Sequence, residues 1–309
     1  MPFSSRPRSA RRTDWPVPER HDRSTASRTQ AHSLAGAPGR HLERAVPCRG
    51  RHVRPSYPTY RDSGISWLGE LPAHWRTLTL SRIGSFLKGG GGTKEDETDE
   101  GYACVRYGDL YTRHDFHVRE SRSRIAPERA SVYTDMQYGD LLLAGSGETL
   151  EEIGKSAVNL LREPAFCGGD VIILRPEIDI DAAYLGYAAD CAPSRHQKSC
   201  MGRGVTVMHI YGRELKNLII PMPPLEEQRQ IGAFLDQATD RIDELVQRTG
   251  FRDRGGQIAG TIGVLIERLR EYRSALITAA VTGKIDVRDT GSADAAATEA
   301  SSVASEAAA

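Results

Sequence analysis

The spacing that comes nearest to a catalytic motif combines Gly145-Ser-Gly147 with Gly154-Lys155-Ser156, after a short apolar run. A phosphate-binding P-loop requires Gly, four residues and then Gly-Lys-Ser or Gly-Lys-Thr, so that backbone N–H groups surround the phosphate. Here Thr149 occupies the position of the first glycine. Three acids that would repel an anion lie between Gly147 and Gly154: Glu148, Glu151 and Glu152. We therefore do not expect a nucleotide site, and a nucleotide-dependent enzyme is kept only as an alternative.

Other groups of reactive residues are also incomplete. His114 and His117 have no third ligand at a suitable spacing, so we expect a pair of surface histidines rather than a metal site. Asp170 lacks the downstream acid and lysine of a nuclease-type metal site. The five cysteines form no C-x-x-C pair, so neither a zinc site nor a disulfide framework is indicated: Cys48, Cys104, Cys167, Cys191 and Cys200. No catalytic residue, metal or cofactor is expected.

Both ends of the chain have the composition of unfolded segments. Residues 1–55 contain twelve Arg, no Lys and four acids, without a helical or strand-like period, and predict a disordered Arg-rich extension. Residues 288–309 predict a disordered tail of small residues. No apolar run reaches the roughly 20 residues that span a bilayer, and the start lacks the apolar core of a secretory signal. A cytoplasmic protein without a membrane segment is expected.

The elements that would position any site are short strands followed by long helices. Apolar runs bounded by turn residues predict strands at 102–107, 140–144, 156–161 and 170–174. A helix-like run at 182–191 and a strand-like run ending at Pro221 complete the pattern. The mixture predicts an α+β fold, with one α/β domain over residues 56–224.

After Pro224 the apolar period changes to 3.6, which predicts helices over residues 225–287. Glycines should interrupt them near 249–257. A narrow apolar stripe on a charged helix needs a partner helix, so we expect antiparallel or coiled-coil-like spacer helices. The residues expected to contact a partner helix or a second chain are Ile231, Phe234, Leu235, Ile242, Leu245, Leu265, Leu269 and Leu276.

Three stretches, in this order, resemble the specificity subunits of type I restriction-modification systems. Residues 60–75, YRDSGISWLGELPAHW, resemble their opening, which often has the pattern Y-K-D-S-G-x-x-W-L-G-x-x-P-x-H-W. Residues 218–236 are similar to the junction between recognition domain and spacer helix, and residues 273–284 to the end of the spacer. The chain is identified as a member of this family, in a half-length form with one target recognition domain.

The resemblance implies a non-catalytic subunit that chooses the DNA site and scaffolds the complex. Partner methyltransferase subunits would methylate adenine, and a restriction subunit would translocate or cleave DNA. A recognition domain of this family contacts the major groove of one half of a split double-stranded target, and antiparallel helices hold two such domains apart. Because the opening motif occurs once and no internal repeat is present, we expect two copies to pair.

Charge argues for a local DNA-binding patch rather than a basic domain. Residues 60–224 contain 19 Lys and Arg against 23 Asp and Glu, whereas DNA-binding domains are usually basic. Residues 113–129 are the richest in Arg and His. Residues 201–206 resemble a loop that lies near DNA in some relatives, which makes Arg203 the first choice. The candidates for base or phosphate contacts are Tyr107, Arg113, Arg122, Arg124, Lys155, Arg195, Lys198 and Arg203.

One further alternative remains open. The neutral charge and the glycine-bearing interruption of the spacer are also compatible with a degenerate or orphan helical interaction protein without DNA recognition.

Overall fold

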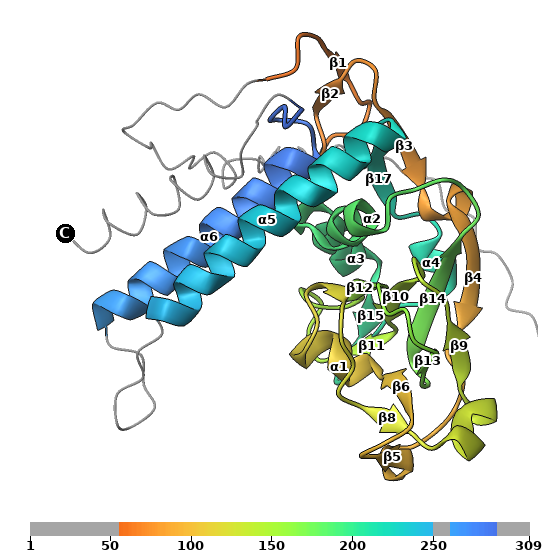
Figure 1. Ribbon diagram of the computed structural model, residues 1–309. Helices are drawn as coiled ribbons and strands as arrows, with labels where there is room; N and C mark the ends of the chain where they lie inside the picture. Colours follow the sequence, from red (N-terminus) through yellow and green to blue (C-terminus); the bar gives the residue numbers. More distant parts are fainter. Residues whose placement is uncertain (1–55, 250–259, 289–309) are drawn as a thin grey trace, which may run out of the picture. The chain divides into compact units, whose positions relative to one another are not determined.

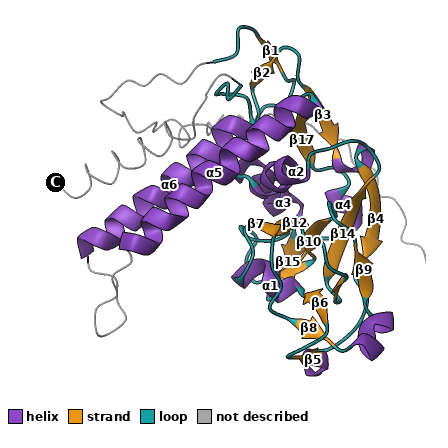
Figure 2. Cartoon of the chain, viewed as in Figure 1, coloured by secondary structure: helices purple, strands orange, loops and turns teal. Residues whose placement is uncertain are grey.

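The computed structural model describes residues 56–249 and 260–288 (Figure 1). Mixed sheets are followed by two long helices packed together, which confirms the α+β prediction (Figure 2). The expected disordered ends and nearly all of the expected break at 249–257 lie outside the described residues.

The first five-stranded sheet is covered on both faces. In order, its strands are β4 (Gly84–Lys88), β14 (Val171–Pro176), β10 (Leu141–Ala144), β12 (Ser156–Asn159) and β7 (Phe116–Val118). Neighbouring strands are antiparallel, except that β12 and β7 are parallel. Side chains of a strand alternate between faces. Leu142 and Ala144 pack into one core cluster, whereas Leu141 and Leu143 pack into another. Burial on both faces explains why this strand is a continuous apolar run.

The second five-stranded sheet contributes Ala103 and Val105 to the core cluster that also contains Leu142 and Ala144. Its order is β5 (Glu97–Thr98), β8 (Arg124–Ile125), β6 (Tyr102–Val105), β13 (Ala165–Cys167) and β9 (Thr134–Met136). The smaller sheets are β1 (Tyr60–Asp62) with β2 (Glu70–Pro72), β3 (Arg76–Thr79) with β17 (Ile219–Met222), and β11 (Ser146–Gly147), β16 (Met208–His209) and β15 (Arg203–Gly204).

Short helices connect these strands. They are α1 (Tyr107–Thr112), α4 (Gly212–Leu215) and the 3₁₀ turns η1 (Leu80–Arg82), η2 (Lys94–Asp96) and η3 (Pro127–Val132).

Helix α2 (Ala182–Asp190) packs on β12 and β7 and also against the long helix α5, so it joins the sheet to the helix pair. Asp181 caps it by accepting a hydrogen bond from the Tyr184 N–H at 2.8 Å. Helix α3 (Ala192–Met201) follows after a short break and contacts α4 and α6.

Helices α5 (Leu225–Thr249) and α6 (Gly260–Val281) run antiparallel and pack on each other (Figure 1). Glu226 and Glu227 lie in the first turn of α5, where the helix dipole favours acids. The predicted stripe residues are buried in one cluster with α2, apart from Leu245, which is partly buried against it: Ile231, Phe234, Leu235, Ile242, Leu265, Leu269 and Leu276. The apolar stripes of α5 and α6 therefore bury each other within one chain. A second copy of the chain would have to bind through a different surface.

The largest core cluster continues across residue 224. It contains Leu141 of the sheet, Leu185 of α2, Ile231 of α5 and Leu269 of α6. The division into a recognition domain at 56–224 and helices at 225–287 therefore stays a proposal about function, because packing does not separate the two parts. None of the helices in the described ranges is long and apolar enough to cross a membrane.

The start of the described chain and the end of α6 meet at Glu227. Its carboxylate accepts a hydrogen bond from Trp75 Nε1 at 2.7 Å and contacts His74 Nε2 at 2.7 Å. Tyr60 Oη donates to the Gly283 carbonyl at 2.9 Å, and Lys284 Nζ donates to the Glu70 carbonyl at 2.9 Å. We call this contact between residues 57–75, Glu227 and residues 283–288 the terminal joint. It joins the three stretches that the sequence comparison singled out.

Gly283 gives a direct test of the terminal joint. Its φ is +69°, and an added Cβ would lie 2.5 Å from the Pro72 ring and 3.2 Å from Trp75. We expect Gly283→Ala to lower the free energy of unfolding by about 1–2 kcal/mol through backbone strain and by about 1–3 kcal/mol more through overpacking. Gly64→Ala is the matched control, because Gly64 has φ +70° and no atom near its Cβ position. Equal losses in urea denaturation would show that the joint is not tightly packed.

Candidate nucleic-acid interface

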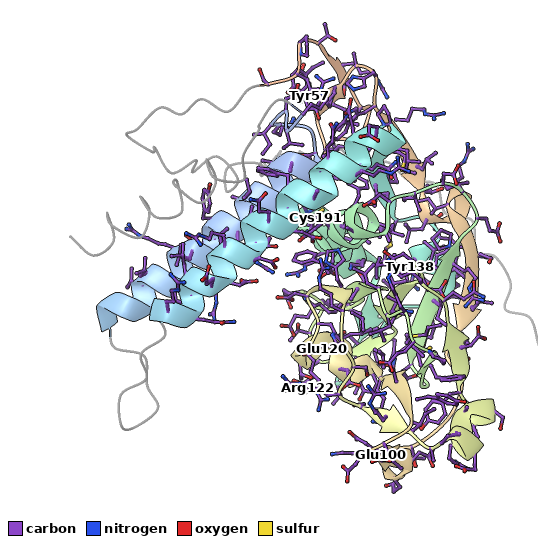
Figure 3. All side chains as sticks on the ribbon, viewed as in Figure 1. Tyr57, Glu100, Glu120, Arg122, Tyr138 and Cys191 are labelled. Atoms are coloured by element: carbon purple, nitrogen blue, oxygen red, sulfur yellow. The ribbon has the colours of Figure 1, made fainter. Side chains whose placement is uncertain are left out.

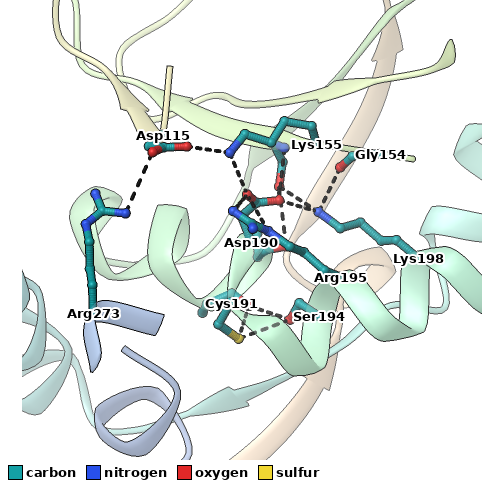
Figure 4. Close-up of polar contacts among 12 residues, drawn as sticks. Asp115, Gly154, Lys155, Asp190, Cys191, Ser194, Arg195, Lys198 and Arg273 are labelled. Carbon is teal, nitrogen blue, oxygen red and sulfur yellow. Dashed lines mark hydrogen bonds and ion pairs between the residues drawn. The ribbon is translucent and has the colours of Figure 1, made fainter. Parts of the chain in front are cut away.

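Three of the eight candidate residues converge on Asp190 (Figure 4). Lys198 Nζ lies 2.7 Å from Asp190 Oδ1, and it donates to the Gly154 carbonyl at 2.7 Å and to Ser156 Oγ at 3.0 Å. Lys198 and Asp190 are both 0% exposed. The prediction that Lys198 contacts DNA is therefore wrong for this structure, because all three of its donors are used inside the domain.

Arg195 and Lys155 surround the same carboxylate. Arg195 donates through Nε at 3.1 Å and through a terminal nitrogen at 2.8 Å to Asp190 Oδ2. Lys155 Nζ lies 3.4 Å from Asp190 Oδ2 and 2.5 Å from Asp115 Oδ1. Burial alone would raise the pKa of Asp190, but the three cations outweigh it and hold that pKa far below its usual range. A role for Lys155 or Arg195 at DNA stays a prediction.

These contacts also explain the Gly154-Lys155-Ser156 element. Gly154 offers its carbonyl to Lys198, Lys155 pairs with two carboxylates, and the Ser156 hydroxyl lies 3.1 Å from Asp190. The element therefore supports a buried ion cluster rather than a ring of N–H groups facing a phosphate. The expectation that it binds no nucleotide stays a prediction.

The Arg-rich segment 113–129 is largely paired within the protein. Its pairs are Arg113 with Asp109 at 3.4 Å, Arg119 with Asp236 at 2.7 Å, Arg124 with Glu163 at 3.2 Å and Arg129 with Asp96 at 2.9 Å. Exposed pairs contribute only about 0–1 kcal/mol, so such an arginine exchanges its carboxylate for a DNA phosphate at little cost. Arg122 is the most open of them, 78% exposed and 3.9 Å from Glu120 (Figure 3).

The two histidines of this segment are buried, so the expectation of a surface pair is wrong. His117 Nε2 lies 2.9 Å from the Ala183 carbonyl, and burial lowers the pKa of both His114 and His117. Across residues 56–249 and 260–288, no group of three or more His, Cys, Asp or Glu side chains could hold a metal ion.

Arg203 differs from the other cations. It begins β15, which forms a hairpin with β16, and within the described part of the chain its side chain makes no hydrogen bond or ion pair. Val205 at the hairpin tip is 95% exposed, and Val207 is also exposed. The turn requires Gly204, whose φ is +153° and whose added Cβ would lie 2.1 Å from the Val207 carbonyl oxygen. The hairpin thus presents a cation and two apolar side chains to solvent.

A short series of contacts connects this hairpin to α1. Tyr111 Oη donates to the Ser146 carbonyl at 3.0 Å, and Ser146 Oγ lies 3.1 Å from His209 Nδ1 on β16. β11 and β15 flank β16, so they are about two strand spacings, or roughly 10 Å, apart. Tyr107 begins α1 and is 42% exposed. Arg113 follows the same helix and shares a depression with Arg122.

We name Tyr107, Arg113, Arg122 and the hairpin 203–207 the candidate DNA face. Arg124 lies on β8, where it pairs with Glu163, and it stays a prediction outside this face. Sequence reasoning missed Val205 and Val207, although the glycines around Arg203 signal a turn. It also missed Asp190, whose signal is a lone acid that ends the apolar run AAYLGYAAD.

Comparison with known proteins places this fold in a family. Residues 132–249 match the model described as type I restriction modification DNA specificity domain. The chain belongs to the family of type I restriction-modification specificity subunits. Specificity subunits of these systems are non-catalytic.

The matching relatives are longer than this chain. The chain is 25% identical over 235 residues to the type I restriction enzyme StySPI specificity subunit of Salmonella potsdam, covering 70% of this chain and 44% of the relative. It is 30% identical over 183 residues to the putative MjaX specificity subunit of Methanocaldococcus jannaschii, covering 57% and 42%. The EcoKI specificity subunit of Escherichia coli is 28% identical over 172 residues, covering 54% and 31%. The chain thus spans less than half the length of these specificity subunits.

Solved structures of specificity subunits are also similar to this chain. The S subunit from M. genitalium is 19% identical with a TM-score of 0.40, covering 64% of this chain and 44% of that one. The HsdS subunit from Thermoanaerobacter tengcongensis is 23% identical with a TM-score of 0.41, covering 70% and 46%.

The buried ion cluster predicts a large stability effect for this specificity subunit. Asp190→Asn leaves Lys198 buried without a counter-charge and should lower the free energy of unfolding by about 3–5 kcal/mol. Asp99→Asn, at an exposed acid, should change it by less than about 0.5 kcal/mol.

The loss of stability caused by Asp190→Asn should depend on pH. Because the pKa of Asp190 is lowered on folding, its contribution is present above the unfolded pKa of about 3.9 and is lost as pH falls. Urea denaturation of wild type and Asp190→Asn should therefore give a constant difference above about pH 5 and a smaller one below about pH 4. A difference that grows on acidification would contradict this charge assignment.

Proposed function

We propose that this chain recognises one half of a split double-stranded DNA target and scaffolds methyltransferase and restriction subunits. The observation that carries the proposal is the β15–β16 hairpin, which lies inside the matched specificity domain and exposes an unpaired Arg203. Its place would be the cytoplasm, where its DNA and partner subunits are found.

The shape and chemistry of the hairpin suit the major groove. That groove admits a two-stranded β-ribbon, an arginine there pairs with guanine O6 and N7, and apolar side chains contact the thymine methyl group. Arg203 would read a guanine, with Val205 and Val207 beside it. Tyr107, Arg113 and Arg122 would contact phosphates and set the register of the domain on the duplex.

The slightly acidic charge of residues 60–224 is consistent with this small face. Most of its arginines are held by acids inside the domain, so sequence-independent attraction to phosphates should be modest. Specificity would then rest on a few base contacts, each worth about 1–3 kcal/mol of discrimination.

The assembly would contain two copies of the chain. One chain supplies one recognition unit, and because its α5 and α6 stripes are buried within the chain, a second copy would bind through another surface. Two copies related by a two-fold axis would read two inverted half-sites. The polar outer face of α5, where Arg241 and Arg248 pair with Glu244, is left for partner subunits or the second copy.

A second function is favoured by one observation. The pairing of Arg113, Arg119, Arg124 and Arg129 with acids is also what a helical interaction protein without DNA recognition would show. Site-specific DNA binding by the chain separates the two functions.

Arg203 provides that test. Arg203→Ala should weaken binding to a duplex selected by the chain from a randomised pool by about 1–3 kcal/mol, or roughly 5-fold to 150-fold. Arg162→Ala is the matched control, since Arg162 is exposed beside Tyr138, at the end of β10 away from β11. Equal affinity of wild type and Arg203→Ala in a titration would reject the base-reading role of Arg203.

The copy number is a separate prediction. Native mass measurement of the chain with a methyltransferase subunit from the same genome should show two copies of the chain per complex. A single copy, both free and in the complex, would disprove pairing of half subunits.

A further inference from the structure

Arg273 on α6 connects the helix pair to the loop that follows α1 (Figure 4). One terminal nitrogen lies 3.3 Å from Asp243 Oδ2 on α5, and the other lies 3.7 Å from Asp115 Oδ2. The guanidinium also lies over the Phe116 ring, 5.4 Å from its centroid. One side chain of α6 therefore contacts both α5 and the DNA-reading domain.

The contact continues into the centre of the domain. Asp115 pairs with Lys155 Nζ at 2.5 Å, and Lys155 pairs with the buried Asp190 on α2. Burial alone would raise the pKa of Asp115, but Lys155 and Arg273 are among the cations that lower it. Asp115 is thus a charged carboxylate between a cation of the domain and a cation of α6.

Phe116 is held in a backbone conformation that the chain does not favour by itself. Its φ is +59°, the left-handed region that bulky residues rarely adopt. Its ring packs on Tyr187 at 4.9 Å and has Lys155, Arg195 and Arg273 within 5.9 Å of its centroid. A cation near an aromatic face is attracted to it, so these side chains hold the ring in place.

A second ion pair attaches the chain to the helix pair a few residues after Asp115. Arg119 pairs with Asp236 on α5 at 2.7 Å, and Tyr187 Oη donates to Asp236 at 2.9 Å. The segment 115–119 is therefore fixed to α6 at its start and to α5 at its end. Because α1 and Arg113 directly precede it, this attachment also fixes part of the candidate DNA face.

We propose that Arg273 is a positioning residue, which holds segment 115–119 in one place relative to the α5–α6 pair. The inference rests on the proposed function. In a complex scaffolded by the helices, the place of this segment determines where the DNA beside it lies relative to the methyltransferase. Arg273 would then control methylation of the target rather than affinity for it.

The test compares binding with methylation for Arg273→Gln and Arg270→Gln in the full chain. Arg270 is the matched control, because it lies one turn earlier on α6 and pairs with Glu267 of its own helix. The binding probe is the duplex selected from a randomised pool, and methylation is measured on it with the methyltransferase subunit present. We expect Arg273→Gln to bind within about 2-fold of wild type and to methylate about 10-fold or more slowly. Arg270→Gln should match wild type in both.

Two further variants separate positioning from loss of folding. Asp115→Asn breaks the same contact from the domain side and should reproduce the split, whereas Arg273→Lys keeps the charge and should recover most of the methylation rate. Methylation by Arg273→Gln at the wild-type rate, or a parallel fall of binding, methylation and thermal stability, overturns the inference. A wild-type chain that neither selects nor binds a duplex overturns the proposed function instead, and this inference with it.

Discussion

The buried carboxylate of Glu227 is the contact on which the arrangement of the chain depends. It lies in the first turn of α5 and is satisfied by Trp75 and His74, which are far away in sequence. Without it, the N-terminal stretch 57–75 would lose its hydrogen-bonded attachment to the start of α5. An unpaired carboxylate in this position would be costly, so the donors and the acceptor require each other. The terminal joint thereby holds the start of α5 and the segment after α6 together with residues 57–75.

Much of the fold could be predicted from periodicity, and much of the site could not. The runs at 102–107, 140–144 and 156–161 contain β6, β10 and β12, because their apolar residues are buried on both faces. Helix α2 and the α5–α6 pair also follow the expected patterns. The roles of Lys155, Arg195 and Lys198 could not be predicted, since a cation in a polar stretch looks the same whether it faces solvent or a buried acid. Only the fold shows that Asp190, at the end of an apolar helix, forms ion pairs with all three of these cations.

The cations of the chain also differ in what they pair with. Lys198 neutralises a buried carboxylate, Arg273 and Arg119 pair with acids across the contact with the helices, and Arg203 makes no hydrogen bond or ion pair within the described residues. In the proposed function, a slightly acidic domain reads DNA through one exposed cation on an element that fits a groove. The same division is consistent with the expectation of a local DNA-binding patch rather than a basic domain.

The central claim is that this chain selects the DNA site for a methyltransferase. The most direct measurement is a genome-wide map of methylated adenines in strains with and without the gene, grown under the same conditions. The account predicts one split motif, made of two short inverted half-sites separated by a fixed gap and methylated only when the gene is present. A strain that produces the chain and its methyltransferase subunit, yet shows no gene-dependent motif, would contradict it.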